Sequence, residues 1–169
     1  TWIRFSTAAI TDASYEKIHQ CKKGDLQIVL HNMEEAVRVK KDKHASTTIG
    51  VQLLLLPENK GEVVQMAKEL KKIGVDYFTV KPFSQHPQSG NILQVDYQEL
   101  LGVEQELKDI ATDDYKIYFR AHSMQKLICK RDYDQCLALP FMVYIDAKGN
   151  LWPCIVFMGK EELSYGNLY

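Results

Sequence analysis

The sequence lacks an excess of charge of either sign, and it lacks any long apolar run. Its 169 residues include 21 lysines and arginines against 22 aspartates and glutamates, so the basic surface that nucleic acid requires is not expected. No apolar run reaches the roughly 18–20 residues that cross a bilayer, and the first residues, TWIRFSTAAITD, lack the basic start and apolar core of a signal peptide. These features predict a soluble, cytoplasmic protein with neither a membrane partner nor a nucleic-acid partner.

Cysteine is scarce as well. The four cysteines stand at irregular spacing, which does not resemble the disulfide framework of a small secreted protein. A reducing compartment is therefore expected, in which the thiols are free or bound to metal.

What the sequence does contain is an alternation of strand-like and helix-like segments. Apolar and β-branched runs predict strands at 2–6, 47–56, 77–81 and 115–121, and apolar residues at helical spacing predict helices at 26–41, 61–73 and 97–111. The run TTIGVQLLLL at 47–56 is typical of a strand that is buried on both faces. This βαβ rhythm predicts an α/β fold with a parallel sheet of about four units, which is half of an eight-unit barrel.

The composition shifts after His122. Residues 123–132 look helical and lead into CLALPFMVYIDAKGNLWPCIVF, where FMVYID and NLWPCIVF predict two short strands joined by a turn. Gly149 is the residue type that adopts a positive φ in such a turn, so the returning strand carries Cys154 back towards Cys136. Two converging thiolates suit an iron–sulfur cluster. The alternative is that the cysteines are buried as small apolar side chains, since two thiols cannot complete a four-ligand site.

This hairpin resembles the first part of the SPASM domain, the auxiliary-cluster extension of radical S-adenosylmethionine (radical SAM) enzymes. The family pattern is a cysteine, a spacer of this kind, an aspartate-glycine turn and an aromatic-Pro-Cys end. The residues at the matching places are Asp146, Gly149, Trp152, Pro153 and Cys154.

The upstream sequence is similar to the radical SAM barrel. IRFSTAAITDASYEKIHQ resembles its fourth strand and the following turn, TTIGVQLLLLPEN its fifth strand, and GVDYFTVKPFSQHPQSG its sixth. The resemblance implies the C-terminal half of a radical SAM (β/α) barrel over residues 1–122 and the N-terminal part of a SPASM domain over residues 123–169.

The family holds a 4Fe-4S cluster on a C-x3-C-x2-C loop and cleaves S-adenosylmethionine to a radical that abstracts hydrogen from the substrate. No C-x3-C-x2-C occurs here, and the chain opens on Thr1 at the threshold of a strand. We therefore expect a fragment that is inactive alone and has no bound cofactor. Its parent would be an iron–sulfur oxidoreductase or a peptide- or protein-modifying maturase that uses S-adenosylmethionine and 4Fe-4S clusters. The alternative is a non-catalytic α/β binding or scaffold domain with structural cysteines.

The chemistry of parallel α/β barrels lies at the carboxyl ends of the strands. The resemblance places Ser6 against S-adenosylmethionine and places Leu54 and Leu55 near its adenine. The alternatives are a serine that merely ends a strand and leucines that belong to the core. The auxiliary cluster would be held by Cys136 and Cys154.

Lys81 is the most informative polar residue outside the cysteines. Tyr77, Thr79 and Lys81 share one strand face by the two-residue period, so Lys81 delivers an ammonium to the barrel mouth if that face points inward. Otherwise it is a solvated charge at a strand end. The other candidates for the substrate cavity are polar residues at or near strand ends, namely Gln52, Arg120 and His122.

Half a barrel would leave one strand edge and one sheet face uncovered. The unpaired edge runs along residues 2–6, and Val51, Leu53 and Val80 are expected to be exposed on the open side. Apolar patches larger than roughly a few hundred Å² rarely stay open on a monomer. We therefore expect self-association through the open half-barrel, in addition to an unknown substrate that is a peptide or protein.

Overall fold

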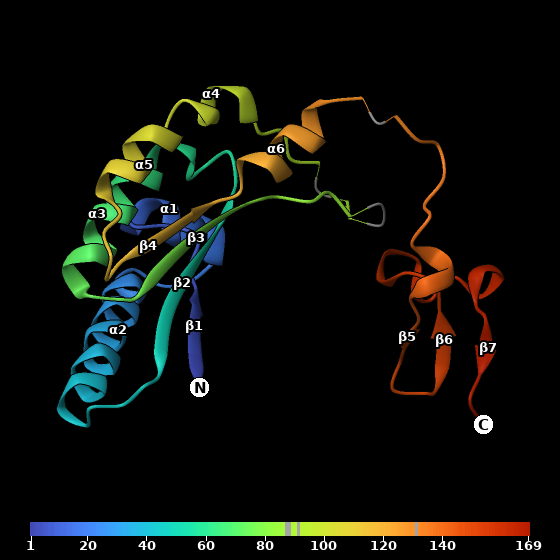
Figure 1. Ribbon diagram of the computed structural model, residues 1–169, viewed down its shortest axis with the longest axis horizontal. Helices are drawn as coiled ribbons and strands as arrows, with labels where there is room; N and C mark the ends of the chain where they lie inside the picture. The colour runs from blue at the N-terminus through green and yellow to red at the C-terminus, as the bar shows by residue number, and fades with distance from the viewer. Residues whose placement is uncertain (87–88, 91, 131) are drawn as a thin grey trace. The chain divides into compact units, whose positions relative to one another are not determined.

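The computed structural model describes residues 1–86, 89–90, 92–130 and 132–169 (Figure 1). It divides into two compact units, of which unit 1 comprises Thr1–Ser84 and Ile92–Cys129 and unit 2 comprises Gln85–Asn91 and Lys130–Tyr169. Two sequence predictions extend into residues outside the described ranges. One is the segment that resembles the sixth strand of the barrel and its loop, and the other is the expected helix at 123–132. Each unit has its own sheet.

Unit 1 is built on a parallel sheet with the strand order β1-β2-β3-β4. Its strands are β1 (Trp2–Ser6), β2 (Thr48–Leu55), β3 (Tyr77–Pro82) and β4 (Lys116–Phe119). The four predicted strands are confirmed. Sheet order equals chain order, because each helical connection returns the chain to the neighbouring parallel position. The predicted α/β fold with a partial barrel of about four units is also confirmed.

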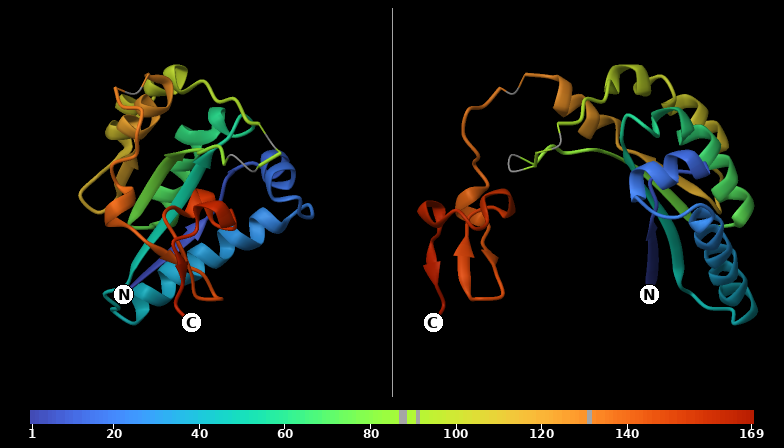
Figure 2. Two further views of the ribbon diagram at one scale, coloured as in Figure 1. Left: turned by 90° about the vertical axis from the view of Figure 1, so that its right-hand side faces the viewer. Right: turned by 180° about the vertical axis from the view of Figure 1, so that it is seen from behind.

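Helices cover one face of this sheet (Figure 2). The helical segments of unit 1 are α1 (Asp12–His19), α2 (Asp25–Asp42), the 3-10 turn η1 (Lys60–Glu62), α3 (Val63–Ile73), α4 (Tyr97–Leu101), α5 (Glu104–Ile110) and α6 (Ala121–Ile128). Helices α2 to α6 all supply side chains to the apolar cluster that contains the buried residues of the sheet. Among the described residues, no helix has the length and apolar character needed to span a membrane.

The core of unit 1 lies between the sheet and these helices. Val51, Leu53 and Val80 are 0% exposed and belong to the same apolar cluster as Met66 and Leu70 of α3. The expectation that these three strand residues would be exposed on an open side is therefore wrong. They point to the helices because the apolar side chains of each strand gather on the face that the helices cover.

Two helical regions differ from the sequence prediction. The segment 97–111 forms α4 and α5 with a break at Gly102 and Val103; a glycine inside a helix costs about 1 kcal/mol relative to alanine. Helix α1 is absent from the prediction because most of its residues are polar. It begins where the Thr11 hydroxyl accepts a hydrogen bond from the Ser14 N–H at 3.4 Å, with Asp12 in the first turn.

Unit 2 contains an antiparallel sheet with the order β5-β6-β7. Its elements are η2 (Leu139–Phe141), β5 (Tyr144–Ile145), β6 (Asn150–Trp152), η3 (Ile155–Phe157), η4 (Glu161–Leu163) and β7 (Gly166–Asn167). The predicted hairpin is confirmed, and Gly149 in its turn has a φ of 79°. The second strand ends earlier than NLWPCIVF suggests, because Pro153 has no N–H to donate to a sheet.

Candidate functional site

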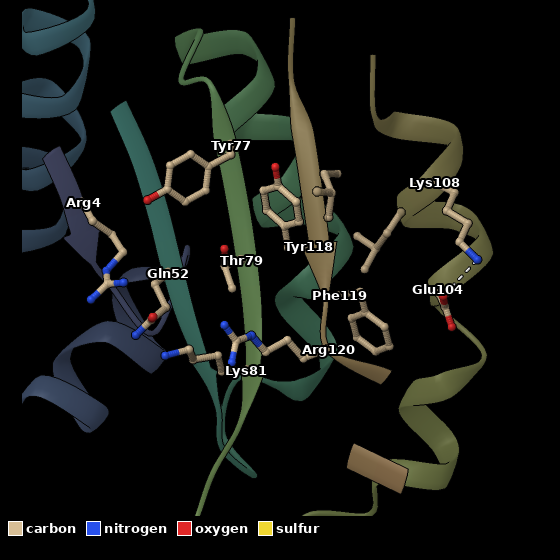
Figure 3. Close-up of a pocket in the computed structure, with 12 residues that line it drawn as sticks. Arg4, Gln52, Tyr77, Thr79, Lys81, Glu104, Lys108, Tyr118, Phe119 and Arg120 are labelled. Carbon is tan, nitrogen blue, oxygen red and sulfur yellow. Dashed lines mark ion pairs between the residues drawn. The ribbon is translucent and has the colours of Figure 1, made fainter. Parts of the chain in front are cut away.

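The sheet face of unit 1 that points away from α2, α3 and α5 carries polar and charged side chains. A cavity of about 510 Å³ opens on this face (Figure 3). All four strands and the residue after β4 contribute to its polar lining, with Arg4, Gln52, Thr79, Lys81, Tyr118 and Arg120. Glu104 and Lys108 of α5 line it as well. The parallel sheet gathers these residues because alternate positions of every strand share a face.

The strand register arranges this face in neighbouring rows. In strand order, the rows are Arg4, Gly50 and Tyr77; then Ser6, Gln52, Thr79 and Tyr118; then Leu54 and Lys81. Arg120 continues the third row, since its N–H donates to the carbonyl of Val80 at 3.1 Å. The charged groups therefore lie towards the carboxyl ends of β3 and β4.

Gly50 makes room for the ring of Tyr77. A Cβ atom at Gly50 would lie 2.0 Å from Cζ of Tyr77, so the ring lies directly over the glycine. The same ring meets the ring of Tyr118 edge-on, with centroids 6.0 Å apart. In Figure 3 the Tyr77 side chain reaches across β2 towards Arg4. Gly50 thus sets the position of an aromatic wall of the cavity.

Four cations line this cavity. Lys108 is paired with Glu104, whereas Arg4, Lys81 and Arg120 form no ion pair within the described ranges. The ion pairs there involve other side chains, such as Glu104 and Lys108 of α5 at 2.9 Å. Burial lowers the pKa of Lys81, and the charges of Arg120 and Arg4 lower it further. This uncompensated positive charge makes the cavity attractive to anions.

Gln52 offers an unused hydrogen-bond acceptor in the middle row. Its Oε1 atom is buried and accepts no hydrogen bond from the described residues. A buried polar atom without a partner costs about 1–3 kcal/mol. A ligand that donates an N–H to this oxygen would therefore gain binding free energy.

Asn59 ties the loop after β1 to the end of β2. The residue is 0% exposed, and its Oδ1 accepts a hydrogen bond from the Leu56 N–H at 2.9 Å. Its Nδ2 donates to the carbonyls of Ala8 at 2.5 Å and Leu54 at 2.8 Å. One amide thus satisfies three backbone groups at the carboxyl end of the sheet.

Glu62 holds the same loop from η1. Its carboxylate accepts the Ile10 N–H at 2.9 Å, the Thr11 hydroxyl at 2.6 Å and the hydroxyl of Ser14. Burial raises the pKa of Glu62, but these hydrogen bonds outweigh burial, so its pKa lies below the ordinary value. The chain between Ser6 and α1 is therefore fixed at the carboxyl end of the sheet by two side chains that the sequence alone did not single out.

The cavity brings together three of the four predicted substrate residues, Gln52, Lys81 and Arg120. The fourth, His122, lies in α6, where it is exposed and outside the cavity lining. Arg4 was missed by the sequence prediction. The available signal was the two-residue period, which places Arg4 on the same face of β1 as Ser6.

The residues predicted to contact S-adenosylmethionine lie on both faces of the sheet. Ser6 is exposed at the end of β1 and is paired in register with Gln52. Leu54 is half-buried and shares the cavity face with Lys81, to which it is paired. Leu55 is 0% exposed in the core on the helix face. The side chain of Leu55 therefore points away from the cavity.

Asp146 organises the hairpin of unit 2. One carboxylate oxygen accepts the N–H groups of Lys148 at 2.8 Å and Asn150 at 3.0 Å. The other accepts Nδ2 of Asn150 at 2.9 Å and Nε1 of Trp152 at 3.0 Å. These hydrogen bonds, the Asn150 side chain first, lower the pKa of Asp146 to about 2. Asp146 thus fixes the strand that leads to Cys154.

The two predicted cluster ligands are free thiols of unit 2. Cys154 is half-buried after Pro153, and Cys136 is exposed. In the part of the chain that the structure describes, no group of three or more histidines, cysteines, aspartates or glutamates could hold a metal ion. An iron–sulfur cluster takes four protein ligands in most sites. Cys136 and Cys154 alone cannot complete such a ligand set.

Comparison with known proteins identifies the fold. No protein-family model and no curated protein matches the sequence. Solved structures of SuiB from Streptococcus suis overlap 98% of this chain. The TM-score and sequence identity are 0.60 and 11% for SuiB, 0.63 and 12% for SuiB bound to S-adenosylmethionine, and 0.60 and 10% for SuiB bound to the precursor peptide SuiA.

The chain has the fold of one part of SuiB. It spans 40% of the SuiB chain in the first of these structures and 39% in the other two. At this level of identity the likeness concerns the fold, whereas substrate and activity have to be argued from the residues of the site.

Proposed function

We propose that this chain is part of a radical SAM enzyme that modifies a peptide or protein. The observation that carries the proposal is the overlap of nearly the whole chain with SuiB, whose solved structures include complexes with S-adenosylmethionine and with a precursor peptide. These two ligands match the cofactor and the substrate class that the family resemblance implies. Residues 1–122 are then the C-terminal half of the barrel, and residues 123–169 are the start of a SPASM domain.

In this function the open sheet face of unit 1 is a wall of the substrate cavity. Gln52, Lys81 and Arg120 bind and orient polar groups of the substrate, and His122 lies outside their cavity as a further candidate. S-adenosylmethionine, bound next to a 4Fe-4S cluster, supplies a hydrogen-abstracting radical in this family. The residues of this chain position the substrate and exclude water from it, and both effects contribute strongly to the rate of such enzymes.

Two further sets of residues border the proposed cofactors. Ser6 and Leu54, which share the sheet face of Gln52 and Lys81, contact S-adenosylmethionine in this proposal, whereas Leu55 contributes its backbone only. Cys136 and Cys154 are ligands of an auxiliary cluster whose other ligands lie outside this chain. Because the 169 residues contain no C-x3-C-x2-C loop, the chain is proposed to be inactive by itself.

Anaerobic reconstitution with iron and sulfide tests the ligand role. We expect the parent protein, which would supply the remaining ligands, to retain iron with visible charge-transfer absorption, and its Cys136→Ser/Cys154→Ser variant to retain less iron. The matched control is Cys21→Ser/Cys129→Ser, because this pair also combines one half-buried and one exposed thiol. Equal iron retention in both variants would contradict the proposal and favour a scaffold domain with structural cysteines.

A second experiment tests the lack of activity of the isolated chain. The purified, reconstituted chain is incubated with S-adenosylmethionine and a reductant, and 5′-deoxyadenosine is measured. We expect none to form, and its formation would refute the proposed dependence on a three-cysteine loop. The coding sequence upstream of Thr1 gives an independent check, since the proposal expects C-x3-C-x2-C there.

A further inference from the structure

The cations on the open face of unit 1 come from two strands and from the residue after a third. Arg4 lies on β1, Lys81 lies on β3, and Arg120 directly follows β4. In Figure 3, Gln52 lies between Arg4 and Lys81, and Arg120 lies beside Lys81 below Thr79. The three charged groups therefore face one space, the cavity of about 510 Å³.

Nothing acidic in the described part of this cavity neutralises the three cations. Its carboxylate-bearing residue is Glu104, which pairs with Lys108 at 2.9 Å. The lowered pKa of Lys81 reflects the same crowding, since the charges of Arg120 and Arg4 add to the effect of burial. An anion that enters the cavity relieves the repulsion among all three groups, so the cavity favours a ligand with more than one negative charge.

The other polar groups select among anions. The buried Oε1 of Gln52 lacks a donor, which a peptide supplies with a backbone N–H and a phosphate ion supplies only with the O–H of its protonated forms. S-adenosylmethionine has one carboxylate, and its ammonium and sulfonium groups give it a net positive charge that three cations repel. A peptide segment with two acidic side chains supplies both the carboxylates and backbone N–H groups.

We infer that the Arg4, Lys81 and Arg120 face binds an acidic segment of the substrate peptide, in which two nearby Asp or Glu side chains pair with the cations and a backbone N–H donates to Gln52. The inference deepens the proposed function and rests on it for the peptide nature of the substrate. The rings of Tyr77 and Tyr118, which also line the cavity, cover the aliphatic parts of the segment.

Fluorescence anisotropy with short labelled peptides tests the inference. We expect a peptide with two neighbouring glutamates to bind, and its glutamine counterpart to bind at least about tenfold more weakly, because charge-assisted hydrogen bonds are lost. The Lys81→Gln/Arg120→Gln variant should raise the Kd of the glutamate peptide by a similar factor. The matched control is Lys23→Gln/Lys43→Gln, which removes the same charge from exposed residues outside the cavity and should leave the Kd unchanged.

Competition experiments separate the possible anions. Gln52→Leu should weaken binding of the peptide more than binding of inorganic phosphate. Equal affinity for the glutamate and glutamine peptides, or an unchanged Kd in Lys81→Gln/Arg120→Gln, overturns the inference. Displacement of the peptide by phosphate or by S-adenosylmethionine at equal concentration also overturns it, because the site would then not be selective for an acidic peptide. Circular dichroism establishes that each variant is folded.

The iron experiment on Cys136 and Cys154 is independent of these measurements. Retained iron together with lost peptide selectivity refutes this inference and leaves the proposed function standing. Selective peptide binding together with cysteine-independent iron retention refutes the proposed cluster and leaves an acidic-peptide site.

Discussion

Replacement of Asn59 by alanine is expected to be one of the most destabilising single changes in unit 1. Asn59 is 0% exposed and satisfies the Leu56 N–H and the carbonyls of Ala8 and Leu54. Alanine keeps none of these hydrogen bonds. The side chain therefore links the loop after β1 to the end of β2.

The magnitude follows from the number of bonds. Three hydrogen bonds at about 1 kcal/mol each give a loss of about 3 kcal/mol in the free energy of unfolding. With a urea m-value of about 2 kcal/mol per M, the midpoint falls by about 1.5 M. Asn59→Asp keeps the acceptor for Leu56 but sets a carboxylate against two carbonyl oxygens. At pH 7 the Asn59→Asp variant should lose at least as much free energy of unfolding as Asn59→Ala. This loss should become smaller at acid pH, because a protonated carboxyl can again donate a hydrogen bond.

Urea unfolding followed by far-UV circular dichroism measures the effect, because helices α1–α6 belong to unit 1. The matched control is Asn32→Ala on the exposed face of α2, which should change the stability by less than about 0.5 kcal/mol. A midpoint for Asn59→Ala as close to the wild type as that of the control would refute the reasoning from hydrogen bonds.

Further predictions concern the cavity wall, the hairpin and the strand edge. Gly50→Ala should cost about 1–3 kcal/mol by displacing the ring of Tyr77, and adding Tyr77→Ala should restore part of the loss in a double-mutant cycle of urea midpoints. The pKa of Asp146 is about 2 in the folded chain and about 3.9 when unfolded, so the stability that Asp146 contributes is complete above about pH 4 and is lost as the pH falls towards 2. Near-UV circular dichroism of the hairpin tryptophan measures this loss, which should be absent in Asp146→Asn. Trp2 and Ile3 are 64% and 45% exposed on β1, so sedimentation should detect self-association that Ile3→Lys weakens, and a monomer at all concentrations would contradict this expectation.

The order of strands and helices could be predicted because hydrophobic periodicity is a local property. The run at 47–56 and the alternation at 77–81 are visible without any tertiary information. Helix α1 could not be found in this way, since it begins where Glu62, far along the chain, accepts hydrogen bonds from the backbone N–H and the hydroxyl of Thr11. A polar segment that is held by a distant carboxylate has no signal in its own periodicity.

The two faces of β3 could be told apart in the sequence but those of β2 could not, and the burial of Val80 on β3 was not predicted. Tyr77, Thr79 and Lys81 mark the polar face of β3, whereas Leu53 and Leu54 on β2 are alike in sequence and lie on opposite faces. The register supplies the missing information, because Leu54 is paired with Lys81 and must share its face. The expectation for Val51 and Leu53 was wrong because it considered the apolar strand β2 without the register of the neighbouring strand β3.

The polarity of the open face changes how two copies of unit 1 would associate. An apolar open face would drive two half-barrels together, but the residues there include Arg4, Lys81 and Arg120. Bringing two such faces into contact would set like charges against each other in a space from which water is excluded, which is unfavourable without an intervening anion. The apolar residues Trp2 and Ile3 lie instead on β1, an edge strand of the sheet. Association is therefore expected to follow that edge and to leave the cationic face open to a ligand.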